Sequence, residues 1–248
     1  MIVNRDERRG RATSFALVAD AYERARPGYP DEAVRWLAGP TPCDVVDLGA
    51  GTGKLTRSLV ALEHRVTAVE PLQEMLDRLR RTVPDAVALA GGAEAIPLGD
   101  ASADVVVCAQ AFHWFDHAVA LPEIARVLRP GGRLALVWNT RDDREPWVAT
   151  LSEAVIGRET VEDRDAAAPL ASSELFEPVE RATFSLVQRL DRDTLLDLVL
   201  SRSYCAVQTE AERAPVLARA GRVFDEHARD GVIELPYLTE CFRARRRG

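Results

Sequence analysis

The sequence predicts an α/β fold, in which a doubly wound, mostly parallel sheet of seven strands carries a helical C-terminal cap. Short apolar runs alternate with helix-like stretches from about residue 44 onward. A glycine-rich turn, Gly49–Gly53, follows the first run, and the next run ends in an acid, Glu70. This pattern is typical of nucleotide-binding units, because turn glycines let a ligand approach the backbone and the acid accepts hydrogen bonds from ribose hydroxyls.

The individual elements follow one another in the order that this fold requires. Strands are expected at residues 44–48, 65–70, 86–90, 104–109, 134–138, 183–188 and 232–242. Helices are expected at residues 13–26, 31–38, 54–62, 71–79, 116–128, 147–156, 193–201 and 209–228. The uninterrupted apolar run Val105–Cys108 favours a central strand covered on both faces. Thr209 and Glu212 have capping-box spacing, which indicates the start of the last helix.

We expect one domain over residues 1–248. Helices within residues 13–38 are expected to form a lid, and residues 141–230 to supply elements that cap the substrate site around the last strands. Within this cap, the polar stretch at 141–181 predicts one short helix followed by a loop. Pro130-Gly131-Gly132 predicts a sharp turn before the fifth strand.

Composition restricts the class of protein. The chain has 248 residues and a net charge of −7, so we expect no nucleic-acid partner. The polar N-terminus predicts no signal peptide and no apolar run reaches transmembrane length, so we expect a cytoplasmic protein without a membrane partner, as a monomer or homodimer. The basic cluster Arg243–Arg247 is expected to be a solvated tail.

Glycine spacing distinguishes between nucleotides. A dinucleotide fingerprint would need glycine at position 54, where Lys54 stands. A P-loop would need glycine at Leu48 and Ser or Thr at Leu55. An acid two residues before the first glycine, Asp47, suits a ligand that carries an ammonium group rather than a pyrophosphate.

Five segments in order support a family resemblance: Val45–Gly53, Ala68–Pro71, Gly92–Pro97, Ala109–Phe115 and Arg126–Gly132. From about residue 22 to residue 139 the chain resembles the class I S-adenosylmethionine (SAM)-dependent methyltransferases of the small-molecule type, the methyltransferase-11 or UbiE-like group. The segments at residues 22–30 and 113–115 further resemble a subgroup that includes trans-aconitate-like methyltransferases. The resemblance implies a Rossmann-like methyltransferase fold.

The resemblance also implies SAM as the cofactor and S-adenosylhomocysteine (SAH) as its product. Asp47 would lie near the ammonium of SAM, Glu70 would hold the ribose diol, and the adenine amine would meet a backbone carbonyl or Glu94, because relatives often have Asp where this chain has Gly92. The full set of implied cofactor contacts is Tyr22, Arg26, Asp47, Gly49, Ala50, Gly51, Glu70, Pro71, Leu72, Ala93, Glu94, Gln110 and Ala111.

Chemistry at the acceptor points to His113. It follows the fourth strand, at the expected mouth of the site, and imidazole can accept a proton near neutral pH, so it is the candidate base; the alternative is a contact to the cofactor. His113 and His117 lie on either side of Asp116, but two histidines and one aspartate are weak evidence for a metal site. Asp116 is expected to cap a helix instead, so we expect no metal. Aromatic candidates for the acceptor pocket, which could equally be core residues, are Trp114, Trp138 and Tyr204.

The favoured function is transfer of a methyl group from SAM to a small-molecule acceptor by in-line displacement, at an oxygen or a carboxylate. The alternative is a methyltransferase-fold protein that binds SAM without methyl transfer, such as a cyclase, a decarboxylase-like enzyme or a regulatory subunit. Formation of SAH in the presence of an acceptor separates the two. An NAD-dependent oxidoreductase is a third option, disfavoured by Lys54.

Overall fold

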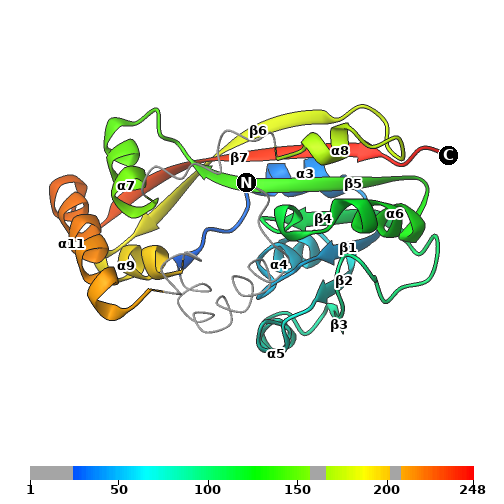
Figure 1. Ribbon diagram of the computed structural model, residues 1–248, viewed down its shortest axis with the longest axis horizontal. Coiled ribbons are helices and arrows are strands. Elements are labelled where there is room, and N and C mark those ends of the chain that lie inside the picture. The colour runs from blue at the N-terminus through cyan, green and yellow to red at the C-terminus, as the bar shows by residue number, and fades with distance from the viewer. Residues whose placement is uncertain (1–24, 157–165, 202–207) are drawn as a thin grey trace. The chain divides into compact units, whose positions relative to one another are not determined.

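The fold is built on one seven-stranded sheet in the order β3-β2-β1-β4-β5-β7-β6 (Figure 1). The structure is a computed structural model that describes residues 25–156, 166–201 and 208–248. The strands are β1 (Asp44–Leu48), β2 (Arg65–Glu70), β3 (Val87–Ala90), β4 (Ala103–Ala109), β5 (Leu128–Arg141), β6 (Glu180–Leu190) and β7 (Ile233–Arg245). The helices are α3 (Asp31–Ala38), α4 (Lys54–Ala61), α5 (Gln73–Thr82), α6 (His117–Val127), α7 (Pro146–Ile156), α8 (Ala168–Ala171), α9 (Arg192–Leu200) and α11 (Glu210–His227), with a short 3-10 helix, η1, at Phe112–Trp114. The predicted doubly wound α/β architecture is therefore confirmed.

The strand order reverses at β1. It pairs in parallel with β2 on one side, where Leu48 lies opposite Val69, and with β4 on the other, where Asp47 lies opposite Val107. In open α/β sheets the ligand site lies outside the carboxyl ends of the strands at such a reversal. The glycine turn follows β1 at this point.

Helices cover both faces of the sheet centre, as alternation along the strands requires. One face packs against α6 and α8 and includes Val46, Leu48, Val106, Cys108, Leu134 and Leu136. The opposite face packs against α3 and α4 and includes Val45, Val105, Val107, Ala135 and Val137. Neighbouring residues of each strand thus belong to different cores.

The chain forms two compact units. One comprises Gly28–Asn139, Arg164–Phe184 and Thr239–Gly248, and the other Met1–Pro27, Thr140–Asp163 and Ser185–Leu238. In the second unit, α7 and α9 both pack on α11, whose N-terminus has the predicted capping box between Thr209 and Glu212. The single domain over 1–248, the lid at 13–38 and the cap at 141–230 stay predictions.

Three features differ from the sequence expectations. The predicted turn at residues 130–132 is a bulge inside the longer β5: Leu128 lies opposite Ala103 and Arg133 opposite Val105, so four residues bulge out against one. Gly131 has φ +76°, which favours glycine at the bulge. A further helix, α8, lies in the region predicted as a loop, and β6 is longer than expected at both ends.

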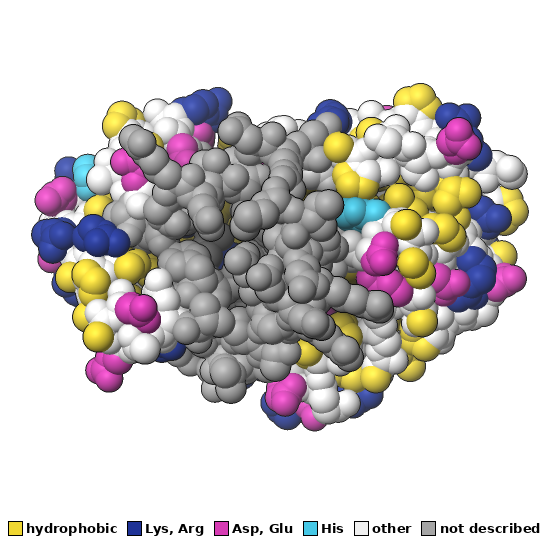
Figure 2. All heavy atoms as spheres, viewed as in Figure 1, with side chains coloured by type: hydrophobic (Ala, Val, Ile, Leu, Met, Phe, Trp, Pro, Cys, Tyr) yellow, Lys and Arg dark blue, Asp and Glu magenta, His cyan; other side chains and the backbone are white. Residues whose placement is uncertain are grey.

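The basic cluster at the C-terminus is not a solvated tail, so that expectation is wrong. Arg243 lies in β7, stacks over the Trp36 ring at 4.2 Å, and pairs with Glu180. Arginines 245, 246 and 247 each donate to a backbone carbonyl. On the face shown in Figure 2, basic and acidic side chains are interspersed. Among the helices that the structure describes, none is long and apolar enough to cross a membrane.

Candidate functional site

The turn after β1 meets the loop after β4 at the carboxyl edge of the sheet. The backbone N–H groups of Gly49 and Ala50 both donate to the carbonyl of Val69, at the end of β2 (2.8 and 3.2 Å). A Cβ placed on Gly49 would lie only 2.7 Å from the Cβ of Ala111. Glycine at position 49 is therefore required for these two loops to pack, and the packing brings predicted contacts from both loops together.

The turn glycines have left-handed backbone conformations but different surroundings. Gly49, Gly51 and Gly53 have φ of +73°, +57° and +89°. A Cβ on Gly53 would lie 3.0 Å from Leu79 and 3.1 Å from Val83, so this glycine lets the turn pack against α5. Among the residues that the structure describes, none has an atom within 4 Å of a Cβ placed on Gly51. Gly51 therefore borders open space, as a ligand cradle requires.

Glu70 lies under this turn. The residue is 5% exposed, and its carboxylate accepts the backbone N–H of Gly51 at Oε2 (2.9 Å) and of Leu72 at Oε1 (3.0 Å). Burial raises the pKa of Glu70, and these two hydrogen bonds oppose the shift. Each carboxylate oxygen keeps a second lone pair. Glu70 thus fixes the turn and still has acceptors for a diol, while Pro71 beside it is exposed and Leu72 half-buried.

Asp47 is fully buried behind the same turn. Its Oδ2 accepts a hydrogen bond from the Thr56 hydroxyl (2.6 Å), whereas Oδ1 is buried and has no hydrogen-bond partner among the described residues. Desolvation raises its pKa from 3.8 to about 7; Thr56 opposes the shift and the charge of Glu70 adds to it. A buried acceptor beside a second carboxylate creates negative potential that a cationic ligand group would relieve. Sequence reasoning found Asp47 but missed Thr56, since a threonine inside a helix carries no signal of its own.

The loop after β3 brings Ala93 and Glu94 to the same edge. Ala93 is buried, and Glu94 Oε1 accepts the backbone N–H of Asp116 (2.8 Å). Glu94 Oε2 lies 3.4 Å from where a Cβ on Gly92 would stand, so this oxygen lies beside position 92. Asp116 occupies the N-cap position of α6, but its side chain accepts no capping hydrogen bond, so the predicted capping role is wrong.

The loop after β4 is strained at Gln110. This residue has φ +56°, a conformation that non-glycine residues adopt at a cost of about 1 kcal/mol or more. The loop is held to the end of β5, since the Gln110 N–H donates to the Val137 carbonyl (2.9 Å) and Nε2 to the Asn139 carbonyl (3.3 Å). Such strain is common at ligand-binding sites.

His113 follows in η1. Its ring lies against the Trp114 ring, with centroids 4.6 Å apart. The side chain is exposed, yet protein surrounds it closely enough that desolvation, with a smaller contribution from His117, lowers its pKa from 6.5 to about 4. The imidazole is therefore neutral at pH 7 and a weaker base than an ordinary histidine.

The His117 side chain contacts Phe112 in two ways. Its Nε2 lies 3.0 Å from the carbonyl oxygen of Phe112, and its ring packs on the Phe112 ring with centroids 4.6 Å apart. Within the described ranges, no group of three or more His, Cys, Asp or Glu side chains is arranged to hold a metal ion.

Aromatic side chains at this edge are partly buried. Trp114 and Trp138 both pack against the core on the α6 face, and the Trp138 ring meets Phe242 edge-on at 5.8 Å. Next to Trp138, the Asn139 side chain donates to the Gly28 carbonyl (2.8 Å) and accepts from the Thr239 hydroxyl (2.7 Å). Asn139 was not predicted as a site residue, because both of its side-chain partners are distant in sequence.

Three predicted contacts belong to the other compact unit or lie outside the described residues. The Arg26 guanidinium donates to Ser201, at Oγ (3.0 Å) and at the carbonyl (3.1 Å). Tyr22 and Tyr204 lie outside the described residues. Their roles stay predictions.

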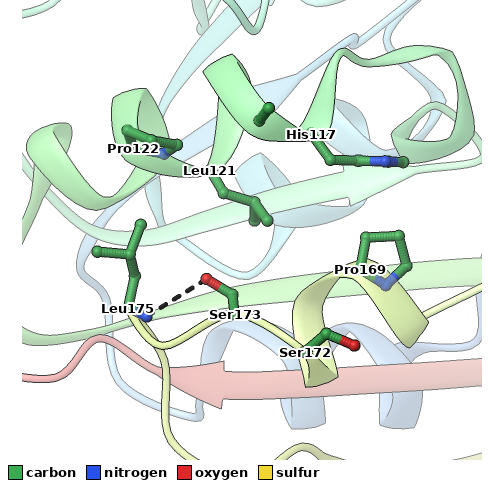
Figure 3. A pocket seen from close by; sticks show the side chains of 8 residues that line it. His117, Leu121, Pro122, Pro169, Ser172, Ser173 and Leu175 are labelled. Atoms are coloured by element: carbon green, nitrogen blue, oxygen red, sulfur yellow. Dashed lines mark hydrogen bonds between the residues drawn. The ribbon is translucent and has the colours of Figure 1, made fainter.

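A shallow pocket of about 370 Å³ lies beside α6 and α8 (Figure 3). Its walls are mostly apolar, with His117, Ser172 and Ser173 as polar members. The Ser173 hydroxyl already accepts the backbone N–H of Leu175. The pocket shares no residue with the predicted cofactor contacts and has no buried charge to orient a ligand.

Comparison with known proteins shows which family the chain resembles. The family model described as a methyltransferase domain matches residues 46–136. An uncharacterized methyltransferase of Mycobacterium tuberculosis is 48% identical over 240 residues, which cover 96% of this chain and 97% of the relative. A malonyl-[acyl-carrier protein] O-methyltransferase of Methylococcus capsulatus is 37% identical over 140 residues, which cover 52% of this chain and 51% of the relative.

Solved structures show the same fold. A protein from Anaeromyxobacter dehalogenans, described as a type II methyltransferase, superposes with a TM-score of 0.67 at 27% identity, covering 89% of this chain and 97% of that chain. A methyltransferase-type structure from Anabaena variabilis superposes with a TM-score of 0.63 at 21% identity, covering 86% and 95%, and supports the fold alone. With near-full-length identity of 48% to a methyltransferase and this sheet order, the chain belongs to the class I SAM-dependent methyltransferases.

Proposed function

We propose that the chain transfers the methyl group of SAM to an oxygen of a small-molecule acceptor, most specifically to a carboxylate. The observation that carries the proposal is the Glu70 carboxylate, which is held under the glycine turn with acceptor capacity to spare. NAD binding would use glycine at position 54 for helix packing, and Lys54 opens α4 there instead.

The residues at this edge fit SAM. The space beside Gly51 lets a ligand approach the protein backbone closely, and the Oδ1 of Asp47, which has no partner among the described residues, suits a nearby ammonium group. Glu70 would accept hydrogen bonds from both ribose hydroxyls. Glu94 Oε2, beside Gly92, would accept the adenine amine. When bound, SAM supplies a methyl group that is already activated by its positively charged sulfur.

The chain's own contribution to catalysis is alignment and exclusion of water. Gln110 is strained and tied to β5, so its loop is preorganised beside the glycine turn. Partly buried rings of Trp114 and Trp138 can pack against an apolar part of the acceptor. These elements hold the acceptor oxygen in line without themselves forming bonds to it.

His113 fits a carboxylate acceptor better than an alcohol. A carboxylate is ionised at pH 7, so no proton has to be removed before transfer. A histidine with a lowered pKa is a poor base for a hydroxyl but can donate a hydrogen bond from its neutral ring to a carboxylate. The O-methyltransferase of Methylococcus capsulatus, to which half of this chain is similar, supports oxygen as the methylated atom.

The decisive test measures SAH formation. Purified protein is incubated with SAM and panels of small carboxylic acids, phenols and amines, and SAH is quantified with the methylated product. Turnover with a carboxylic acid supports the proposal, whereas turnover confined to amines contradicts it. SAM binding without SAH formation on any panel would favour the non-transferring alternative.

A further inference from the structure

The loop after β3 is tied to α6 along most of its length. At its start, the Gly91 N–H donates to the carbonyl of Glu70, which places the loop beside the ribose acid (3.3 Å). Near the start of α6, the N–H of Asp116 donates to Glu94 (2.8 Å). The loop's own backbone hydrogen bonds close short turns, from the Ala95 N–H to the Gly92 carbonyl (3.3 Å) and from the Leu98 N–H to the Ile96 carbonyl (2.8 Å), and its further bonds reach α6.

Glu123 and Arg126, one turn apart on α6, hold the middle of this loop. Glu123 Oε2 accepts the N–H of Ile96 (3.2 Å), and Arg126 Nη2 donates to the Ile96 carbonyl (3.1 Å). Arg126 Nη1 donates to the Leu98 carbonyl and to the Asp100 carboxylate (both 2.8 Å). The two side chains also pair with each other, at 2.8 and 2.9 Å.

This arrangement uses the guanidinium as a planar fork. Its donors reach two backbone carbonyls and two carboxylates from one fixed plane, which a lysine could not do. The Arg126 side chain is 31% exposed, and the Asp100 carboxylate is 80% exposed, so the Asp100 pair by itself contributes little to stability. The bonds to loop carbonyls therefore carry most of its structural effect.

We propose that Arg126 and Glu123 are positioning residues of the cofactor site: they clamp the loop after β3 against α6 so that Ala93 and Glu94 meet the adenine ring. This inference rests on the proposed function, because adenine recognition by this loop is part of it. Helix α6 and the residue before it thus hold Glu94 at the Asp116 N–H, and they hold the middle of the loop through Glu123 and Arg126. Neither Arg126 nor Glu123 needs to touch the cofactor.

Arg129 provides a matched control. It has 38% side-chain exposure and pairs with Asp44 (2.9 Å) and Asp104 (2.7 Å), at the opposite end of β1 and β4. Arg126→Ala and Arg129→Ala therefore each remove a partly exposed arginine with two carboxylate partners. Only the first releases the adenine loop.

The experiment is isothermal titration of the wild type and both variants with SAH and with S-inosylhomocysteine, in which an oxygen replaces the adenine amine. Arg126→Ala should weaken SAH binding about tenfold, the effect of one misplaced hydrogen bond, and should reduce the preference for SAH over the inosine analogue. Arg129→Ala should leave both affinities within about twofold. A purely structural role would lower the melting temperature of both variants and leave the preference unchanged, and that result would overturn the inference.

A milder pair of variants covers the case in which Arg126→Ala does not fold. Glu123→Gln and Arg126→Lys keep side-chain volume or charge but lose part of the clamp, and each should reduce the preference for SAH over the inosine analogue. Retention of the wild-type preference in both folded variants contradicts the inference. A wild type that binds neither ligand would overturn the proposed function itself.

Discussion

Removal of the Glu70 carboxylate should weaken both cofactor binding and the folded state, each by a measurable amount. Glu70→Ala deletes both acceptors that the ribose diol would use, and hydrogen bonds to a charged group contribute about 1.5–3 kcal/mol each. Even one such bond corresponds to a tenfold or greater weakening, so the Kd for SAH should rise at least tenfold. The same change leaves the N–H groups of Gly51 and Leu72 without their acceptor, which should lower the free energy of unfolding by about 1–3 kcal/mol.

The assay is isothermal titration with SAH, at a temperature where circular dichroism shows the variant to be folded. Glu74→Ala is the matched control, since Glu74 is an exposed glutamate in the first turn of α5 and should leave the Kd unchanged. Glu70→Gln should fall between the wild type and Glu70→Ala, because one acceptor oxygen remains. A folded Glu70→Ala protein that binds SAH within twofold of the wild type would refute the ribose role of Glu70.

Three further predictions follow from the same edge of the sheet. The pKa of Asp47 is raised to about 7 in the folded state, so protonated Asp47 favours folding and the wild type loses stability as pH rises from about 4 to 7. Asp47→Asn lacks this titration, so denaturant titrations should show its free energy of unfolding rising relative to that of the wild type by roughly 2–4 kcal/mol over this range. A difference that stays constant with pH would contradict the burial argument. With SAM saturating, so that the Asp47 carboxylate is already paired with the ammonium of SAM, His113 with its pKa lowered to about 4 should give a kcat/KM for a carboxylate acceptor that is flat from pH 6 to 8. A kinetic pKa near 6.5 that disappears in His113→Gln would instead show an acting base. Gly51→Ala and Gly53→Ala share the strain of an alanine at positive φ, but only Gly53→Ala also forces a Cβ against α5, so it should lower the melting temperature more. Gly51→Ala should weaken SAH binding more than Gly53→Ala does, and a larger loss of binding in Gly53→Ala would mean that Gly51 does not border the ligand.

The strands and the turn around residues 44–70 could be predicted because the sequence patterns that specify them are local. The glycine turn, Asp47 and Glu70 lie within 24 residues of one another, and the observed β1 and β2 match the expected bounds. Turn chemistry and apolar runs are properties of neighbouring residues, so the sequence contains them directly.

The errors arise where partners are far apart in sequence. Arg243 was expected to be solvated, but Trp36 and Glu180 lie 207 and 63 residues away along the chain. Asp116 stands at the N-cap position of α6, as the pattern predicts, but its side chain makes no capping hydrogen bond. Its backbone N–H instead donates to Glu94, in the loop after β3. The bulge in β5 likewise depends on the register with β4, which no local pattern specifies.

The buried position of Cys108 allows unfolding of this protein to be measured by alkylation of a native thiol. Its thiol lies in β4, the strand between β1 and β5, is fully buried, and has a pKa raised well above 9 by desolvation. A thiol reagent can reach it only when the centre of the sheet opens, so the rate of alkylation at Cys108, followed by peptide mass spectrometry, measures the population of the open chain. A ligand at 100 times its Kd stabilises the folded state by about 2.7 kcal/mol, which should slow this labelling about a hundredfold. The affinity for SAH can thus be measured at one cysteine, before any acceptor is known.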